Sequence, residues 1–168
     1  MRRKTKRKTT LIILLSVCIL QAELGTLHAD SEDCKVPSVL GFETGLTIPE
    51  VQKQIKEHHP YAEMDLKSPT NLAMGSGLGT TTEFFFDETG HLYRIEHIVF
   101  SLILNEESIL EHLKERYGEP TSREYGRPIW TLCSGRYTVQ ARMGVEILDT
   151  ELQKVYHKQV ADSIIGVE

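Results

Sequence analysis

The first 29 residues set the strongest limit on what this chain can fold into. Six basic residues and no acidic residue stand within the first ten positions, and an uncharged run follows from Leu11 to Leu20. A basic start followed by about ten apolar residues is typical of an export signal peptide, and it is too short to span a membrane as a helix. We therefore predict a signal peptide over residues 1–29, no permanent membrane span, and a single soluble α+β domain over residues 30–168.

Export predicts a periplasmic or secreted protein. The small residue Ala29 favours cleavage after it, and Ala22 offers a second small-residue site. A second interpretation remains open, because Leu15-Ser16-Val17-Cys18 has the order of a lipoprotein box. Such a box requires a small residue where Val17 stands, so a lipoprotein anchored at Cys18 is the weaker alternative.

The charge balance of the exported part limits its partners. Without residues 1–29 the chain has 13 basic and 23 acidic residues. An acidic surface repels phosphate backbones and anionic lipid. We therefore expect no nucleic-acid partner and favour a protein partner in the cell envelope or outside the cell. Solubility alone also accounts for such a charge.

Two cysteines, Cys34 and Cys133, remain after cleavage. An even pair in an oxidising compartment favours a disulfide over a metal site or a nucleophile. The bond would close a loop of about a hundred residues, for which the chain-entropy model gives roughly 4–5 kcal/mol as an upper figure. Two independent thiols are the alternative.

Two segments carry helix signals. Thr47 and Glu50 have the spacing of a capping box, and the helix that they start should stop near His58 and His59, before Pro60. The second segment has Asn105 as a cap, an apolar stripe, and Gly118 as a stop. The stripe consists of Ile109, Leu110, Leu113 and Tyr117.

Alternating apolar and polar residues predict two hairpins. The first joins Thr82–Phe86 and His91–Phe100 through the turn 87–90, and the second joins Ile129–Cys133 and Arg136–Met143 through Ser134-Gly135. We interpret Thr150–His157 as a further strand, although its apolar positions fit a helix equally well.

These elements predict a fold of two helices packed on one face of an antiparallel sheet of about four to five strands. Val51, Ile55 and Pro60 align with Ile109, Leu113 and Gly118 at a common offset of 58 residues. This offset favours a degenerate α-β-β duplication. The hairpins do not keep the offset, so independent α-β-β construction stays open.

Three stretches carry a resemblance to a known group of proteins: 45–51 (GLTIPEV), 86–92 (FDETGHL) and 113–120 (LKERYGEP), with Trp130 beyond them. Across roughly residues 40–158 the chain resembles small exported bacterial α/β modules of the BamE and beta-lactamase-inhibitor-protein-like kind. The resemblance implies a non-catalytic, protein-binding module. It transfers no site residue.

Chemical motifs are scarce. The glycine-rich stretch Gly75-Ser76-Gly77-Leu78-Gly79 precedes a strand and lacks a following Lys-Ser/Thr pair, so it does not match a phosphate loop. No histidine spacing fits a zinc site, and no nucleophile motif is present. We therefore expect no catalytic residues, no metal and no cofactor.

Aromatic residues give the best candidates for binding. Phe84, Phe85 and Phe86 alternate across a strand, so Phe85 should point away from a one-sided core. Tyr125, Arg127 and Trp130 are residue types enriched in binding hot spots, although Trp130 suits the core even better.

The sequence therefore predicts an exported, non-catalytic protein-binding module of the inhibitor, immunity or envelope-assembly accessory type. The alternative is a small periplasmic hydrolase or ligand carrier with a pocket under the loop Gly75–Gly79.

Overall fold

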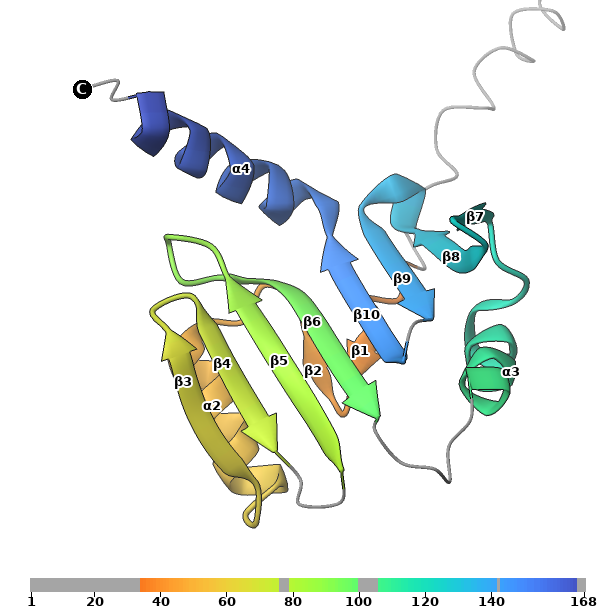
Figure 1. Ribbon diagram of the computed structural model, residues 1–168, viewed down its shortest axis with the longest axis horizontal. Coiled ribbons are helices and arrows are strands. Elements are labelled where there is room, and N and C mark those ends of the chain that lie inside the picture. Colours follow the sequence, from red (N-terminus) through yellow and green to blue (C-terminus); the bar gives the residue numbers. More distant parts are fainter. Residues whose placement is uncertain (1–33, 76–78, 100–105, 142, 166–168) are drawn as a thin grey trace, which may run out of the picture. The chain divides into compact units, whose positions relative to one another are not determined.

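The computed structural model describes residues 34–75, 79–99, 106–141 and 143–165 (Figure 1). The predicted signal peptide, Cys18, Asn105 and part of the glycine-rich loop lie outside the described residues. Residues from Lys35 onward cluster as one compact unit. No helix in the described ranges is long and apolar enough to cross a membrane.

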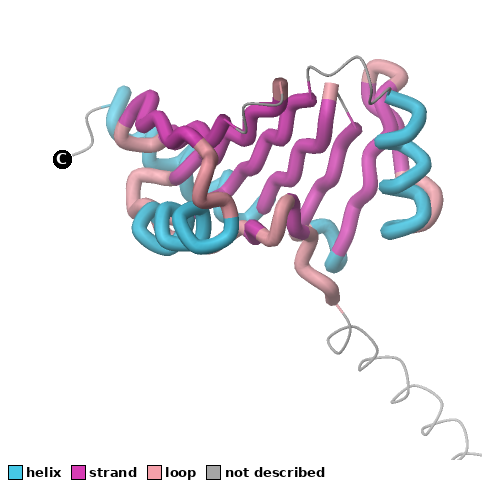
Figure 2. Tube along the Cα trace, turned by 90° about the horizontal axis from the view of Figure 1, so that it is seen from below, coloured by secondary structure: helices cyan, strands magenta, loops and turns pink. Residues whose placement is uncertain are grey.

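Eight antiparallel strands form the main sheet, in the order β3-β4-β5-β6-β10-β9-β8-β7. Figure 2 shows the strands as one continuous layer. A separate two-stranded sheet precedes it, and the described residues also form three α-helices and a 3-10 turn, η1. The predicted sheet of four to five strands with two helices is therefore wrong. The elements are β1 (Ser38–Val39), β2 (Phe42–Glu43), α2 (Ile48–His58), β3 (Glu63–Ser68), β4 (Asn71–Gly75), β5 (Thr80–Phe86), β6 (Leu92–Val99), α3 (Glu106–Tyr117), β7 (Ser122–Glu124), β8 (Arg127–Leu132), η1 (Cys133–Gly135), β9 (Tyr137–Ala141), β10 (Gly144–Asp149) and α4 (Thr150–Ile165).

The order of elements repeats, but with a larger unit than the sequence indicated. A helix followed by four strands occurs twice, as α2 with β3 to β6 and as α3 with β7 to β10. The last strands of the two units, β6 and β10, pair at the centre, and the first strands, β3 and β7, form the edges. The predicted α-β-β unit was two strands too short, because β3 and β4 were missed in the first half and β7 and β10 in the second. Of these, β3 is exposed over Glu63–Lys67 and β7 is exposed throughout, so neither shows an alternating pattern.

Both predicted helices are confirmed. Glu50 accepts hydrogen bonds from the backbone N–H of Thr47 at 2.8 Å and from its hydroxyl at 2.7 Å. Both hydrogen bonds lower the pKa of the Glu50 carboxyl, and the bond from the backbone N–H has the larger effect. The second helix ends at Tyr117, where Gly118 takes a left-handed φ of 79°.

The predicted strand Thr150–His157 is wrong, because this segment begins helix α4. Asp149 is fully buried, and its carboxylate accepts hydrogen bonds from the backbone N–H groups of Glu151 and Leu152 at 3.0 and 3.2 Å. This arrangement caps the start of the helix. The ring of Tyr156 then stacks on Tyr93 of β6, with 5.0 Å between the centroids.

The first predicted hairpin is confirmed as β5 and β6. Its turn depends on buried Asp87, which accepts hydrogen bonds from the backbone N–H groups of Thr89 and His91 at 2.9 and 2.8 Å. The second hairpin, β8 and β9, also forms, but η1 replaces the predicted two-residue turn. The strand predicted to reach Met143 ends at Ala141, since Gly144 already begins β10.

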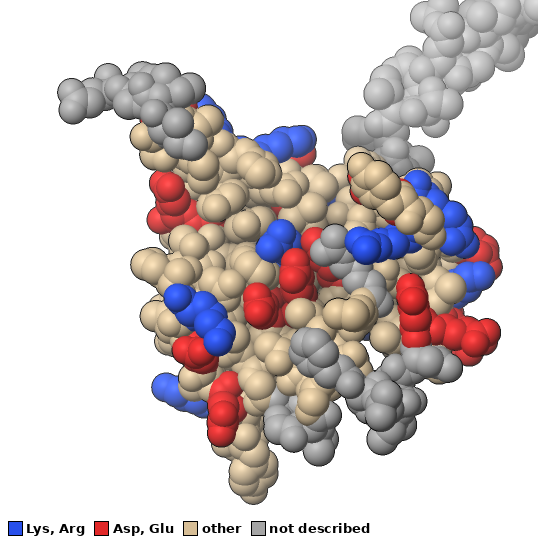
Figure 3. Space-filling model, in the orientation of Figure 1, with Lys and Arg blue, Asp and Glu red and all other residues tan. Residues whose placement is uncertain are grey.

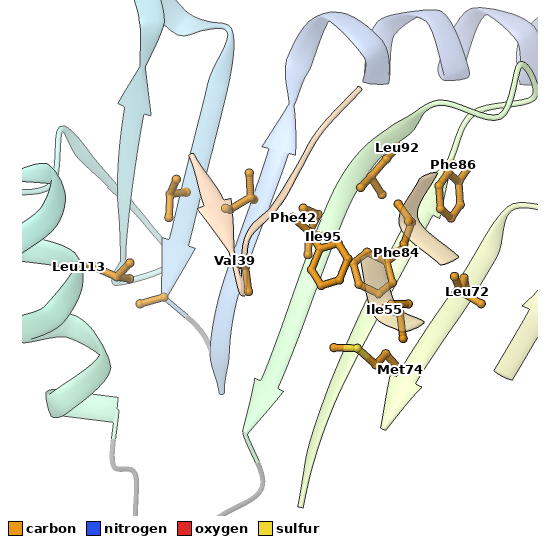
Figure 4. Packing of buried hydrophobic residues seen from close by; sticks show 14 of the residues in the cluster. Val39, Phe42, Ile55, Leu72, Met74, Phe84, Phe86, Leu92, Ile95 and Leu113 are labelled. Carbon is orange, nitrogen blue, oxygen red and sulfur yellow. The ribbon is translucent and has the colours of Figure 1, made fainter. Parts of the chain in front are cut away.

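The core lies on one face of the sheet (Figure 4). A single cross-strand row runs through six strands, and each of its side chains is at most 1% exposed. The row consists of Leu72, Phe84, Ile95, Ile147, Val139 and Trp130. Phe42 of β2, Val51 and Ile55 of α2, and Leu113 of α3 belong to the same cluster, so β2, α2 and α3 pack on this face.

Cys34 and Cys133 are both disulfide-bonded, and they are the only cysteines among the described residues, so the bond joins them. The predicted disulfide is confirmed. Cys133 lies in η1 with a left-handed φ of 55°.

Candidate protein-binding face

The sheet face opposite the core is the candidate functional site. Successive side chains of a strand point to opposite faces of the sheet, so the residues next to those of the core row point to this face. On the same strands they form a second cross-strand row. Figure 1 looks onto this face, with α2 behind the sheet. We call it the open face and define it by Ala73, Glu83, Phe85, Arg94, Glu96, Ile98, Arg127, Ile129, Thr131, Thr138, Gln140, Glu146 and Leu148.

Three glutamates stand side by side at the centre of the open face. Glu83 of β5 is opposite Glu96 of β6, and Glu96 is opposite Glu146 of β10. Residues directly opposite each other on antiparallel strands have Cβ atoms about 4.5–5.5 Å apart. We call these three residues the acidic ladder. In Figure 3, which shows the same face, acidic side chains gather near the middle.

Arg94 is held beside the ladder by two contacts. Its Nε lies 3.3 Å from a carboxylate oxygen of Glu96, and its guanidinium lies over the ring of Phe85, 3.9 Å from the centroid. Phe85 and Arg94 are directly opposite in the β5–β6 register. The cation–π contact and the ion pair together fix the position of this cation.

A depression of about 430 Å³ lies next to the ladder. Its lining includes Glu96, Ile98, Glu106, Arg127, Met143 and Glu146. Met143 is 69% exposed. Gly144 also lines the depression, and a Cβ atom at this position would lie 1.7 Å from the carbonyl oxygen of His97. Only glycine therefore allows β6 and β10 to approach this closely.

The four predicted binding residues occupy three different environments. Phe85 and Arg127 lie on the open face. Tyr125 is 95% exposed in the turn between β7 and β8, with a left-handed φ of 49°. Trp130 is fully buried, and its indole Nε1 donates a hydrogen bond to the carbonyl oxygen of Gly118 at 2.8 Å. The structure thus places Trp130 in the core, where it connects β8 to the end of α3.

The acidic ladder was not found from the sequence. Each of its glutamates stands between residues of the core face, as Glu96 does between Ile95 and His97. This alternation indicates that each glutamate points away from the core. The cross-strand register that brings the three together depends on a pairing between β6 and β10, which no local pattern specifies.

A second depression, of about 380 Å³, borders the described ends of the glycine-rich loop. Met74 and Thr80, on either side of that loop, line it together with His59 and His97. The Nδ1 atom of His97 lies 2.9 Å from the hydroxyl of Thr82, and burial lowers the pKa of His97. Residues 76–78 lie outside the described ranges.

Within the described part of the chain, no group of three His, Cys, Asp or Glu side chains is placed to hold a metal ion. Comparison of the chain with protein-family models, with curated proteins and with solved structures found no match in any of the three. Any assignment of function therefore depends on the fold and on the open face.

Proposed function

We propose that this chain is an exported, non-catalytic module that binds a protein partner through the open face. The inhibitor, immunity and envelope-assembly accessory types all fit this description. The observation that carries the proposal is the contrast between the two sheet faces. The same strands send a fully buried apolar row to one face and a partly exposed row of mixed chemistry to the other.

The composition of the open face supports the proposal. Apolar residues such as Phe85, Ile98 and Leu148 stand among charged and polar ones, and all three keep part of their surface exposed. Protein interfaces of the non-obligate kind combine apolar and polar surface in this way. Arginine and aromatic residues, both present here, are enriched in such interfaces.

The proposal that the protein is exported has support that does not depend on the open face. The basic and apolar start of the chain is typical of a signal peptide, and a disulfide persists best in an oxidising compartment. The resemblance to BamE-like and beta-lactamase-inhibitor-protein-like modules also implies a binding function without catalysis.

Site-specific photocrosslinking in the producing cell tests the binding face. A photoreactive residue at Thr131 or Thr138, both on the open face, should give a discrete crosslinked adduct with a partner protein. The same residue at exposed Lys53 or Lys56 of α2 is the control and should give none. Adducts from the α2 positions alone, or none from any position, would contradict the proposal.

The alternative function, a small hydrolase or ligand carrier, retains one specific observation. The depression of about 380 Å³ at the described ends of the glycine-rich loop is lined by polar residues that include His59 and His97 and by apolar residues that include Met74. A depression of this size can hold a small ligand. Ligand-induced chemical-shift changes at Met74 and Thr80, with none on the open face, would favour this alternative.

A further inference from the structure

The hairpin of β7 and β8 ends in a strained turn at one edge of the sheet (Figure 1). Its loop consists of Tyr125 and Gly126 alone, because Glu124 is already opposite Arg127 in the register. Both loop residues have a left-handed φ, of 49° and 80°, as a type I′ turn requires. Asparagine, aspartate and glycine are the usual residues at the first of these positions, and a bulky side chain at positive φ is an outlier. Tyr125 is therefore an unfavourable residue for this turn.

The strain at Tyr125 is not offset by burial of its ring. The side chain is 95% exposed, so it adds almost no apolar burial to the fold. The other described residues with a left-handed φ that are not glycine differ from it: Leu40 is only half exposed, Cys133 is held by the disulfide, and Ser134 is small. Strained backbone residues cluster at binding and catalytic sites. A strained and exposed tyrosine therefore indicates a role outside the folding of the chain.

We propose that Tyr125 is the anchor of the partner interface, meaning the residue that contributes most to binding, and that it enters a pocket of the partner protein. The pocket has apolar walls, a group that accepts a hydrogen bond from the phenol hydroxyl, and an acidic rim. This inference rests on the proposed function, because the hairpin continues the open face through Arg127 and Ile129 of β8. It adds the anchoring residue and the chemistry of the surface that receives it.

The ring and the hydroxyl of Tyr125 define the interior of the pocket. A tyrosine at an interface buries a large apolar ring, and its hydroxyl usually finds a hydrogen-bond partner when it is buried. At 95% exposure, nearly the whole side chain is available to a partner. Tyrosine is enriched among the few residues that carry most of the binding energy, and such residues fill well-packed pockets.

The hairpin holds the ring in place before binding. Arg123 closes the turn, since its Nη1 donates a hydrogen bond to the carbonyl oxygen of Gly126 at 3.2 Å. Behind the turn, the backbone N–H of Thr121 donates to the carbonyl oxygen of Ile129 at 2.8 Å, and the hydroxyl of Thr121 accepts from the N–H of Thr131 at 2.9 Å. A tyrosine on a preorganised turn loses little conformational entropy on binding, because only two side-chain torsions become fixed.

The charges beside Tyr125 predict the acidic rim. Arg123, Glu124 and Arg127 are all exposed, so two arginines and one glutamate surround the ring. The chain from residue 30 onward has the opposite balance, with 13 basic and 23 acidic residues. Figure 3 shows basic side chains gathered over β7 and β8. Because interfaces bring opposite potentials together, a basic tip on an acidic protein fits an acidic rim on the partner.

The test separates binding from stability with three tyrosine variants. Tyr125→Asn gives the turn a residue type that favours positive φ, and Tyr125→Phe keeps the ring but removes the hydroxyl. The control is Tyr61→Asn, because Tyr61 is 96% exposed in the turn between α2 and β3 and has no left-handed φ. A photoreactive residue at Thr138 of the open face captures the partner in the producing cell. The captured protein is identified by mass spectrometry and purified, and its Kd for each variant is measured by biolayer interferometry at low and at high salt.

We expect Tyr125→Asn to change stability and binding in opposite directions. It should raise the melting temperature by a few degrees, because it relieves the strain, and weaken binding about ten-fold or more, because it removes the anchor. Tyr125→Phe should weaken binding several-fold through loss of one hydrogen bond. Tyr61→Asn should bind as the wild type does. High salt should weaken binding of the wild type, since it screens the charges at the rim.

The outcomes that would overturn the inference are distinct from those that would overturn the proposed function. Unchanged binding by Tyr125→Asn to the protein captured at Thr138 would keep the open face as the binding site but refute the anchor. A lower melting temperature of Tyr125→Asn would show that the ring supports the fold. Binding that is insensitive to salt would refute the acidic rim. Failure to capture any protein at Thr138 or Thr131 would contradict the proposed function as well.

Two further outcomes would replace the partner. A Thr138 adduct with a second copy of the chain would make the hairpin a contact of self-association. Binding to vesicles of phosphatidylglycerol that Tyr125→Asn abolishes and Tyr61→Asn retains would assign the tip to a lipid surface. Either result would overturn the inference of a partner protein with an acidic pocket.

Discussion

The two faces of the sheet differ although the same strands build them. On the core face, a row from Leu72 to Trp130 is at most 1% exposed at every position. One residue along, the row from Ala73 to Ile129 carries three adjacent glutamates and keeps them partly exposed. A strand alternates its side chains between faces, so each strand contributes to both rows at once. The comparison teaches that the core row determines stability and that the open row is free to serve another role.

The largest contrast is expected between neighbouring phenylalanines. Phe84→Ala removes a fully buried ring and should lower the free energy of unfolding by about 3–5 kcal/mol. Phe85→Ala removes a partly exposed ring with one cation–π contact and should lower it by about 1 kcal/mol. Urea unfolding followed by circular dichroism measures both. Equal losses would show that the two faces are equally important for stability.

The disulfide allows stability and binding to be separated. Cys34→Ser should lower the free energy of unfolding by about 2–4 kcal/mol, because the bond closes a long loop. Binding at the open face should persist below the new melting temperature. Intact mass spectrometry after alkylation without reduction provides the check on the bond itself. Two alkylated thiols per wild-type chain would contradict the assignment.

Gly144 tests the junction between the two halves of the sheet. Gly144→Ala should lower the free energy of unfolding by about 1–3 kcal/mol, because the new Cβ would lie 1.7 Å from the His97 carbonyl oxygen. Gly75→Ala is the matched control, since nothing lies within 4 Å of the corresponding Cβ. Differential scanning calorimetry of the two variants and the wild type measures the difference in melting temperature. A wild-type melting temperature for Gly144→Ala would be evidence against the observed pairing of β6 with β10.

His97 gives the core face a pH dependence. Burial lowers its pKa in the folded state, so below the unfolded pKa of about 6.5 the unfolded chain binds more protons at this site. This contribution should therefore destabilise the fold as the pH falls below about 6.5, and the loss should end below the lowered folded pKa. Unfolding midpoints between pH 7.5 and 4.5 should fall less for His97→Gln than for the wild type. If the unfolding midpoints of the wild type and His97→Gln fell by the same amount with pH, the destabilising contribution of His97 would be contradicted.

The sequence predicted those parts of the fold that depend on neighbouring residues. The capping pair Thr47 and Glu50, the stop at Gly118 and the Asp87 turn all act within a few positions and were recognised correctly. The exposed edge strands β3 and β7 were missed because neither has a buried side to produce a pattern.

The start of α4 was misassigned because the cap is Asp149, a residue that also ends β10 and is paired with Arg136 across the sheet. Local signals for a strand end and for a helix start coincide at this position. The candidate site depended even more on long-range pairing. Phe85 was identified from the alternation of side chains along its strand, and Arg127 from its residue type. Glu83 and Glu96 become neighbours through the β5–β6 hairpin, whereas Glu146 joins them only through the pairing of β6 with β10.

The smallest effect tests the central claim most directly, namely that the core row determines stability and the open face does not. Trp130 of the core row and Thr131 of the open face are neighbours on β8. The measurement is urea unfolding of Thr131→Ala beside Trp130→Ala and the wild type. Thr131 is exposed, so its replacement should change the free energy of unfolding by about 0.5 kcal/mol or less, whereas loss of the buried Trp130 ring should lower it by about 3–5 kcal/mol. Equal losses for the two variants would contradict this account.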